Sequence, residues 1–304
     1  MSKESPLQSQ ARRKFLRSAA LLPLVHAGGV LLGASAATST TAQAENAAAA
    51  QREFVRVPGS ALAAHLKSSP LAILPLGSVE YHGPSGPPGT DSMIATGLAQ
   101  RLVPRLRASL FPTVEYTHSP AHTAAFRGTI SIRPETITAY LTDILTGLIA
   151  HGFDKIFVLN GHDGNIGSAR LAISQVTQEH QDAAVLFVSW WETLPGPLVD
   201  SLRLFSQPNG GHGHGGPLEL SVAAAFAPEF VLPGQGPDLP PIQSFTEDFP
   251  YYLEKSRAEG WPGYSGKLSE ISPEKGERLV QIALERLQQL VETWLANPAK
   301  PGSW

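Results

Sequence analysis

The sequence predicts an α/β fold in a single domain, with a largely parallel sheet flanked by helices. Two observations support this class. Short, continuous apolar runs of strand length alternate with longer segments that carry apolar residues at helical spacing. After three of the apolar runs the chain enters a polar or glycine-rich stretch before the next helical segment. We find no internal repeat and no sign of a second globular domain.

The predicted strands are continuous apolar runs, a pattern typical of strands that are covered on both faces of a parallel sheet. They are LAILPLG (71–77), KIFVLN (155–160) and AAVLFVSWW (183–191).

The predicted helices follow these strands and close the domain. Asp91 is expected to cap the first helix, and Ser272, followed by Pro273, is expected to cap the last. Gly152 is expected to end the second. The helical segments are 92–106, 134–152, 166–178, 217–226 and 272–295.

The segment 228–266 is rich in proline, glycine and aromatic residues. It is too long for a simple connection and too apolar for a disordered tail, so we expect a lid or a subunit contact there.

Composition limits the function. The 304 residues are 42% hydrophobic and 16% charged, as in a globular protein, and the formal net charge of -3 provides no basic surface for nucleic acid. The expected partner is a small molecule. The chain has no cysteine, so any metal site must use His, Asp and Glu.

The N-terminus resembles an export signal. Arg12 and Arg13 precede a weakly apolar stretch, and Ala42-Gln43-Ala44 offers a cleavage site of the A-x-A kind. We expect residues 1–44 to be a twin-arginine signal peptide, 45–304 to be the mature domain, and the protein to be exported or periplasmic, with no membrane attachment after cleavage. The alternative is an uncleaved membrane anchor, for which the interrupted apolar stretch is a poor match.

Metal-type ligands follow each predicted strand. In an open parallel sheet the carboxyl ends of the strands form the crevice where ligands bind, so residues from distant loops can meet there. Nitrogen and oxygen donors without sulfur suit zinc, manganese or iron. The loops supply Glu80, His82 and Asp91, then His162 and Asp163, then His212, His214 and Glu219.

Each motif has an ordinary explanation when it is taken alone. Glu80 and His82 could belong to a polar loop, His162 could be a turn histidine within NGHDGN, and GGHGHGG could be a flexible tract. Their occurrence after successive strands favours a metal site.

Five motifs together resemble the creatininase family of metal-dependent amidohydrolases. They are LPLGSVEYHGPSGPPGTD, FRGTISIRPET, GFDKIFVLNGHDGN, HGGPLELS and GYSGKLSEISPEKGE, and they span about Leu71 to Leu290. The resemblance implies an α/β layered fold, a homo-oligomer such as a hexamer, and two divalent cations per subunit.

Matched residue by residue, the resemblance implies that Glu80, His82, Asp91, His162 and Glu219 are the metal ligands, with Asp91 as the bridge. Creatininase itself has a further ligand glutamate where this chain has Gly164. Glu219 is preferred to Asp163 as the group that completes the shell, because a helix holds it in place. His214 matches a histidine near the substrate; the alternative is a supporting role in the glycine-rich loop.

The expected function is cleavage of a C–N amide bond in a cyclic amide, formamide or peptide-like small molecule by metal-activated water, with His214 and Glu219 transferring protons. Tyr81 and Ser85 stand where the family commonly has glutamine and histidine, which leaves the substrate open. The alternative function is an exported metal- or solute-binding protein without catalysis. A serine α/β-hydrolase is disfavoured because no G-x-S-x-G elbow follows a strand.

Overall fold

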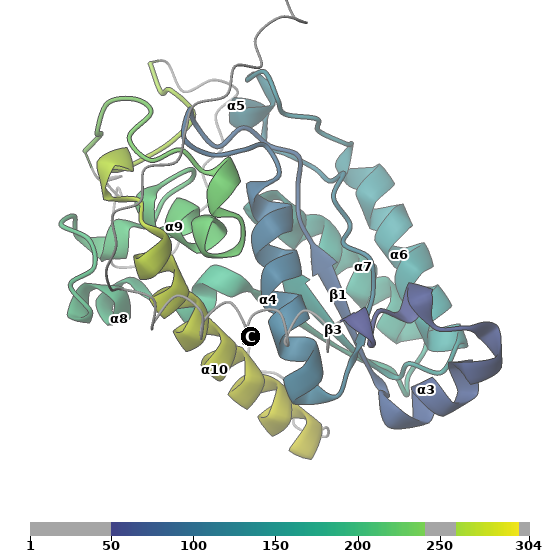
Figure 1. Ribbon diagram of the computed structural model, residues 1–304. Coiled ribbons are helices and arrows are strands. Elements are labelled where there is room, and N and C mark those ends of the chain that lie inside the picture. The colour runs from purple at the N-terminus through teal and green to yellow at the C-terminus, as the bar shows by residue number, and fades with distance from the viewer. Residues whose placement is uncertain (1–49, 241–259, 298–304) are drawn as a thin grey trace, which may run out of the picture. The chain divides into compact units, whose positions relative to one another are not determined.

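The computed structural model describes residues 50–240 and 260–297, all within one compact unit (Figure 1). The predicted signal peptide 1–44 lies outside the described residues and stays a prediction, as does export. In the described ranges, no helix combines the length and apolar character needed to cross a membrane.

The sheet has four parallel strands in the order β2-β1-β3-β4, as the sequence predicts for the fold class. The three apolar runs form β1 (Leu71–Leu76), β3 (Lys155–Asn160) and β4 (Ala184–Ser189). The edge strand β2 (Ser109–Leu110) was not predicted, since two residues are too few for a periodic signal.

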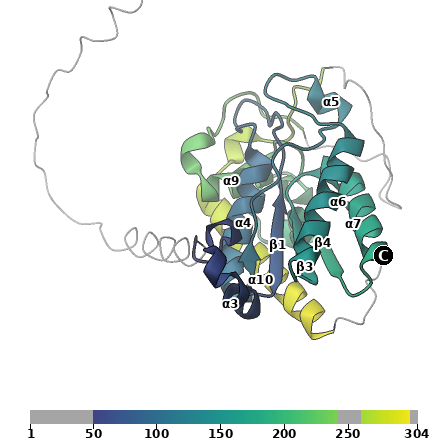
Figure 2. The same ribbon diagram turned by 90° about the vertical axis from the view of Figure 1, so that its right-hand side faces the viewer.

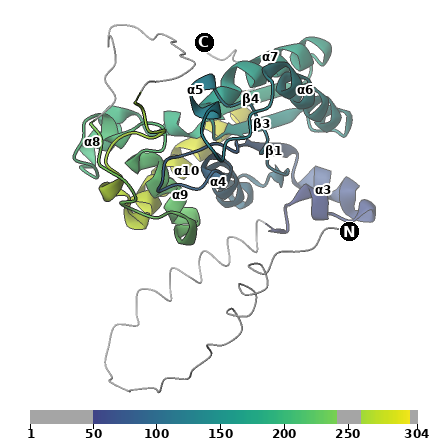
Figure 3. The same cartoon turned by 90° about the horizontal axis from the view of Figure 1, so that it is seen from above.

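Helices cover both faces of the sheet, and Figures 2 and 3 show β1 and β3 between the two helical layers. The larger helices are α4 (Thr90–Leu106), α6 (Pro134–Ala150), α7 (Ile166–Glu179), α9 (Pro217–Phe226) and α10 (Pro273–Ala296). Three shorter helices are α3 (Leu62–Ser68), α5 (Ala121–Ala124) and α8 (Gly196–Ser201).

Side-chain alternation along the strands divides the core in two. Ile73 and Phe157 belong to the cluster packed with α4, α9 and α10, whereas Leu74 and Val158 belong to the cluster packed with α6 and α7. Because every β1 residue is buried, the strand lacks a polar face and fixes the loop that follows it.

Helices α9 and α10 approach each other closely at Gly276. A Cβ atom there would lie 1.8 Å from the Ser221 carbonyl oxygen, so only glycine fits. Ser272 accepts a hydrogen bond from the Lys275 backbone N–H at 3.3 Å, which confirms it as the cap of α10.

Candidate metal centre

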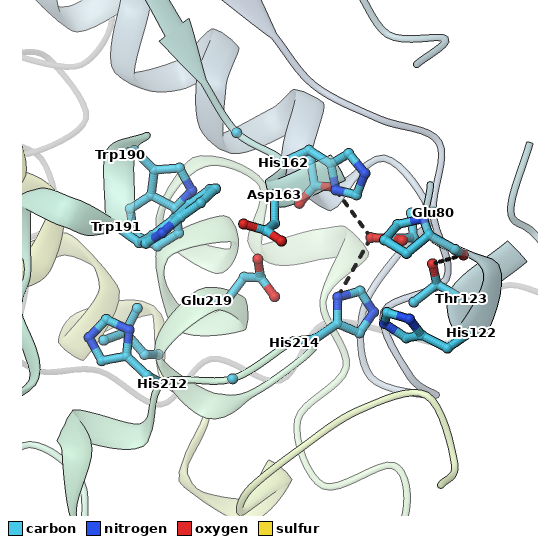
Figure 4. A pocket seen from close by; sticks show the side chains of 15 residues that line it. Glu80, His122, Thr123, His162, Asp163, Trp190, Trp191, His212, His214 and Glu219 are labelled. Atoms are coloured by element: carbon cyan, nitrogen blue, oxygen red, sulfur yellow. Dashed lines mark hydrogen bonds and ion pairs between the residues drawn. The ribbon is translucent and has the colours of Figure 1, made fainter. Parts of the chain in front are cut away.

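The predicted loops meet at a cavity of about 270 Å³ beside the carboxyl ends of β1 and β3 (Figure 4). The β1–α4 loop, the turn after β3 and the glycine-rich segment before α9 each contribute side chains. Among the lining residues are Glu80, Asp91, His162, His214 and Glu219.

One group of metal-type ligands, the Glu80 triad, consists of Glu80, Asp91 and His162. One ligand atom from each lies within 4.8 Å of the others. His162 Nδ1 is 3.3 Å from Glu80 Oε2 and 3.0 Å from Asp91 Oδ2. All three side chains are buried at the ends of central strands or the start of α4.

A second group, the Glu219 triad, consists of His82, Asp91 and Glu219, again with ligand atoms within 4.8 Å. His82 Nε2 is 3.1 Å from Asp91 Oδ1 and 3.7 Å from Glu219 Oε2. Glu219 is the more open member, because its side chain is 15% exposed whereas that of His82 is fully buried. Asp91 is therefore shared, with one oxygen toward each histidine.

Backbone carbonyl groups fix the orientation of both triad histidines. His82 Nδ1 donates to the Glu80 carbonyl at 2.8 Å, and His162 Nε2 donates to the His118 carbonyl at 2.8 Å. The remaining ring nitrogen of each histidine is then unprotonated in the neutral ring and faces the carboxylates. A histidine held in this way by its second nitrogen is characteristic of metal sites.

His214 has the same arrangement. Its Nε2 donates to the Tyr81 carbonyl at 2.7 Å, and its Nδ1 is 3.6 Å from Glu80 Oε2. Its ring lies 4.4 Å from that of His82 between centroids. His214 thus points into the site with a free nitrogen, and it forms a third ligand group with Glu80 and His82.

The carboxylates control the charges of the buried histidines. Burial alone would lower the pKa of His82, but the negative charges of Asp91 and Glu219 outweigh burial and raise it to about 10. Burial likewise opposes the charged form of His162, yet Glu80 and Asp91 raise its pKa to about 9. The site therefore attracts positive charge.

Burial and neighbouring charges also shift the pKa values of His214, Glu219 and Asp91, but not all in the same direction. Burial, reinforced by the nearby charge of His82, lowers the pKa of His214 to about 4, so this ring is neutral at pH 7. Burial raises the pKa of Glu219 to about 7, although His82 acts against this shift. Burial also opposes ionisation of Asp91, but the two facing histidines hold its pKa well below the usual range.

The residues fit a bound divalent cation. Glu80 Oε1 is buried and has no hydrogen-bond partner in the described part of the chain, which would be costly unless a ligand satisfied it. The donors are all imidazole nitrogens and carboxylate oxygens, a set that suits zinc, manganese or iron.

The structure separates two predicted loop residues from the triads. His212 Nε2 donates to the Leu194 carbonyl at 2.7 Å, and burial lowers its pKa. Asp163 lines the cavity but belongs to none of the ligand groups found among the described residues. The geometry thus favours Glu219 over Asp163 as the third member of its triad.

The predicted capping role of Asp91 is wrong. Helix α4 begins at Thr90 with Gly89 as its N-cap, and Asp91 lies in the first turn. Its carboxylate is held instead by His82, by His162, and by the Ser78 hydroxyl, which donates to Oδ2 at 2.6 Å. The two positively charged partners outcompete the backbone N–H groups for this side chain.

Sequence reasoning missed three residues of the site. Ser78 orients Asp91, and Trp190 and Trp191 line the cavity. The two tryptophans follow β4 directly, so their position at a strand end was the available signal. Tyr81 and Ser85, by contrast, are not among the lining residues: Tyr81 stacks on Phe126 and the Ser85 hydroxyl accepts from the Gln235 backbone N–H.

The family model described as Creatininase: Creatinine amidohydrolase matches residues 59–291. This chain belongs to the creatininase family. The membership confirms the resemblance inferred from the five motifs and makes the chain a hydrolase of this family.

Three relatives match more than half of the chain. A 3-dehydro-scyllo-inosose hydrolase of Thermotoga maritima is 26% identical over 252 residues, which cover 74% of this chain and 78% of the relative. A creatinine amidohydrolase of Pseudomonas putida is 27% identical over 232 residues, covering 72% and 87%. A mycofactocin precursor peptide peptidase of Mycobacterium tuberculosis is 33% identical over 57% of this chain and 65% of its own length.

Solved structures confirm the fold. A crystal structure of creatinine amidohydrolase (creatininase) superposes with a TM-score of 0.69 at 23% identity, covering 83% of this chain and 99% of that one. Among the similar creatininase structures are one described as a Mn form and one described as a Zn-Zn type.

Proposed function

We propose that the protein is a metal-dependent amidohydrolase that cleaves a C–N amide bond of a small molecule with two divalent cations, zinc, manganese or iron. The two triads would hold one cation each: Glu80, Asp91 and His162 the first, and His82, Asp91 and Glu219 the second. Family membership and the intact set of five predicted ligands support this assignment.

The position of Asp91 carries the proposal. Its two oxygens face different histidines at 3.1 and 3.0 Å, and those histidines belong to different triads. A carboxylate can bridge two cations through its two oxygens, whereas one imidazole nitrogen binds one. A shared carboxylate between two triads therefore indicates a paired site.

Bound divalent cations would lower the pKa of a water molecule toward about 7 and polarise the substrate carbonyl. The chain's own residues would handle the protons. Glu219 faces the cavity and its side chain is 15% exposed, so its carboxylate can accept a proton from the attacking water. His214 Nδ1 points into the site, so this nitrogen can take up the proton and pass it to the leaving nitrogen.

The cavity limits the substrate to a small molecule or the end of a longer one. Its volume of about 270 Å³ is at or below the lower end of the range for small-molecule sites. The relatives' names include a creatinine hydrolase, a cyclic inosose hydrolase and a peptide peptidase, so family membership leaves the molecule open.

The test measures metal content and hydrolysis in one preparation of the 45–304 protein. We expect two cation equivalents per chain, release of amine from members of a broad amide panel, loss of turnover after chelation, and recovery with zinc or manganese. Stoichiometric metal without hydrolysis of any amide would instead favour the binding-protein alternative.

Export through a twin-arginine signal and assembly into a homo-oligomer complete the proposal. The paired arginines Arg12 and Arg13 support export, and the family resemblance supports an oligomer. In an oligomer, the segment 228–266 is a candidate subunit contact. Residues 241–259 of this segment lie outside the described residues.

A further inference from the structure

Residues 260–266 form a strap that packs on two of the loops around the cavity. Tyr264 fixes the strap in place and is 2% exposed. A Cβ atom at Gly83 would lie 2.8 Å from the Tyr264 Cβ, and one at Gly215 would lie 3.0 Å from it. The Tyr264 hydroxyl donates to the Pro237 carbonyl at 2.8 Å. The strap is therefore held against both the β1–α4 loop and the glycine-rich segment before α9.

The strap brings Trp261 into contact with two imidazole rings of the cavity. The Trp261 and His214 ring centroids are 5.7 Å apart, and those of Trp261 and His122 are 5.5 Å apart. Both histidines line the cavity, whereas the half-buried Trp261 is not among the described lining residues. Trp261 can therefore affect a reaction only through the side chains that it contacts.

Trp261 also supports the hydrogen bond that orients His214. The ring of His214 donates from Nε2 to the Tyr81 carbonyl at 2.7 Å. Tyr81 stacks on Phe126 with centroids 4.9 Å apart, and Phe126 meets Trp261 edge-on at 5.9 Å. One indole thus contacts the donor residue directly and the acceptor residue through Phe126.

These contacts decide which nitrogen of His214 faces the site. The χ2 torsion of histidine is broad and roughly twofold, so its intrinsic preference does not select one ring orientation. The side chain is 22% exposed and borders the cavity, which leaves space for it to turn. Without Trp261, the remaining ring neighbour among the described residues is His82, at 4.4 Å between centroids. Packing by the strap is therefore needed to keep Nδ1 directed at the site.

We propose that Trp261 is a positioning residue for His214, which holds the imidazole against the Tyr81 carbonyl so that Nδ1 faces the reacting bond. The inference rests on the proposed function, in which this nitrogen passes a proton to the leaving nitrogen as the C–N bond breaks. Loss of alignment then matters most when the departing amine is a poor leaving group. Metal binding is not affected, because Trp261 contacts none of the five proposed ligands through its ring.

The first measurement is the exchange with water of the His214 Nε2 proton in the zinc-loaded protein labelled with ¹⁵N-histidine. The resonance is assigned by its absence from His214→Gln. We expect exchange to be about tenfold faster or more in Trp261→Ala. Trp261→Phe keeps an aromatic ring and should stay close to the unaltered protein. Tyr140→Ala is the matched control and should change nothing, because Tyr140 is 51% exposed on α6, which contributes no residue to the described cavity.

The second measurement compares the hydrolysis of N-methylacetamide and 4-nitroacetanilide, which share the acyl group. Methylamine needs a proton in order to leave, whereas 4-nitroaniline leaves with much less help. In Trp261→Ala, kcat for N-methylacetamide should fall about tenfold or more, with KM and zinc equivalents unchanged. The kcat for 4-nitroacetanilide should stay within about twofold.

Unchanged exchange in Trp261→Ala, an equal loss of rate for the two amides, or loss of zinc from the variant would overturn the proposal. Trp261→Leu, which keeps the apolar bulk, allows the same comparisons if the alanine variant does not fold. If the unaltered protein hydrolyses neither amide, nor any other, that result counts against the proposed function. The exchange measurement needs no turnover and still decides whether Trp261 positions His214.

Discussion

The two triads are built from different parts of the fold. The Glu80 triad stands at the ends of β1 and β3, in the middle of the sheet, and its side chains are at most 4% exposed. The Glu219 triad depends on α9 and the glycine-rich segment before it, and Glu219 is open to the cavity. The first is set by the core of the sheet, whereas the second forms part of the cavity wall.

This difference indicates a division of roles. A ligand set fixed by buried strands is preorganised and binds a cation tightly. A partly exposed carboxylate in the cavity wall can exchange protons with substrate and solvent. We expect the Glu80 triad to retain metal under conditions in which the Glu219 triad releases it.

The largest expected effect comes from Glu80→Gln. Removing this carboxylate leaves the first cation with one fewer negative ligand, so activity should fall by about a thousandfold or more. The fold should persist, with the unfolding midpoint of the metal-free protein within about 4 °C of the unaltered one.

A second variant, Glu219→Gln, tests the two triads separately. It should lose activity, yet metal analysis should still find one cation equivalent per chain. Glu135→Gln, at an exposed position on α6, is the control for the carboxylate-to-amide exchange and should be fully active. Full activity in Glu80→Gln would contradict the assignment.

The second effect is a dependence of metal affinity on pH. The pKa values of His82 and His162 are raised to about 10 and about 9, so both rings carry protons at neutral pH until a cation displaces them. Lowering the pH strengthens these competing protons, and two of them leave per pair of cations. The combined binding constant should therefore fall about a hundredfold per unit between pH 8 and pH 7.

Below pH 7 protonation of Glu219, whose pKa is about 7, adds to the competition in its triad alone. The Glu219 triad should then release its cation first as the solution is acidified. Titration against a chromophoric chelator at several pH values measures both effects. Affinity that does not change with pH would show that the histidines are not the ligands.

The smallest effect concerns Gly164. A Cβ atom there would lie 2.3 Å from the His118 carbonyl oxygen and 2.6 Å from His162 Nε2, the two atoms whose hydrogen bond orients the ligand ring. Gly164→Ala should weaken metal binding to the Glu80 triad about 10- to 100-fold. Isothermal titration with zinc, compared between variants, measures the change.

Gly167→Ala is the matched control, because a Cβ atom at this position in α7 meets nothing within 4 Å. It should leave metal binding unchanged and stabilise the fold by about 0.5–1 kcal/mol. Equal metal affinity in the two variants would refute the proposed role of the His118 contact. Any side chain at residue 164 must therefore displace the His118 carbonyl or the His162 ring.

Much of the fold could be predicted because β1, β3 and the long helices have strong periodic signals. Glu80, His82, Asp91 and His162 could be predicted as neighbours because they follow adjacent parallel strands, and the structure brings them together. The two-residue strand β2 carries no such signal.

The roles of the other site residues could not be predicted, because they depend on contacts between different parts of the fold. Asp91 has the sequence position of a helix cap, yet its role is determined by His82 of the same loop and by His162, which follows β3. Likewise, nothing local shows that His212 donates to the Leu194 carbonyl while His214, two residues later, points into the site. Such choices between neighbouring histidines are decided by which backbone carbonyl lies within reach.

The contact at Gly276 links the end of the chain to the reaction centre. Helix α9 carries Glu219, and α10 abuts it so closely at Ser221 that no side chain fits between them. Any bulkier residue at position 276 would push α9 and shift its acid without touching a ligand. Mutant libraries aimed at a new substrate range should therefore vary residues at the α9–α10 contact as well as those of the cavity wall.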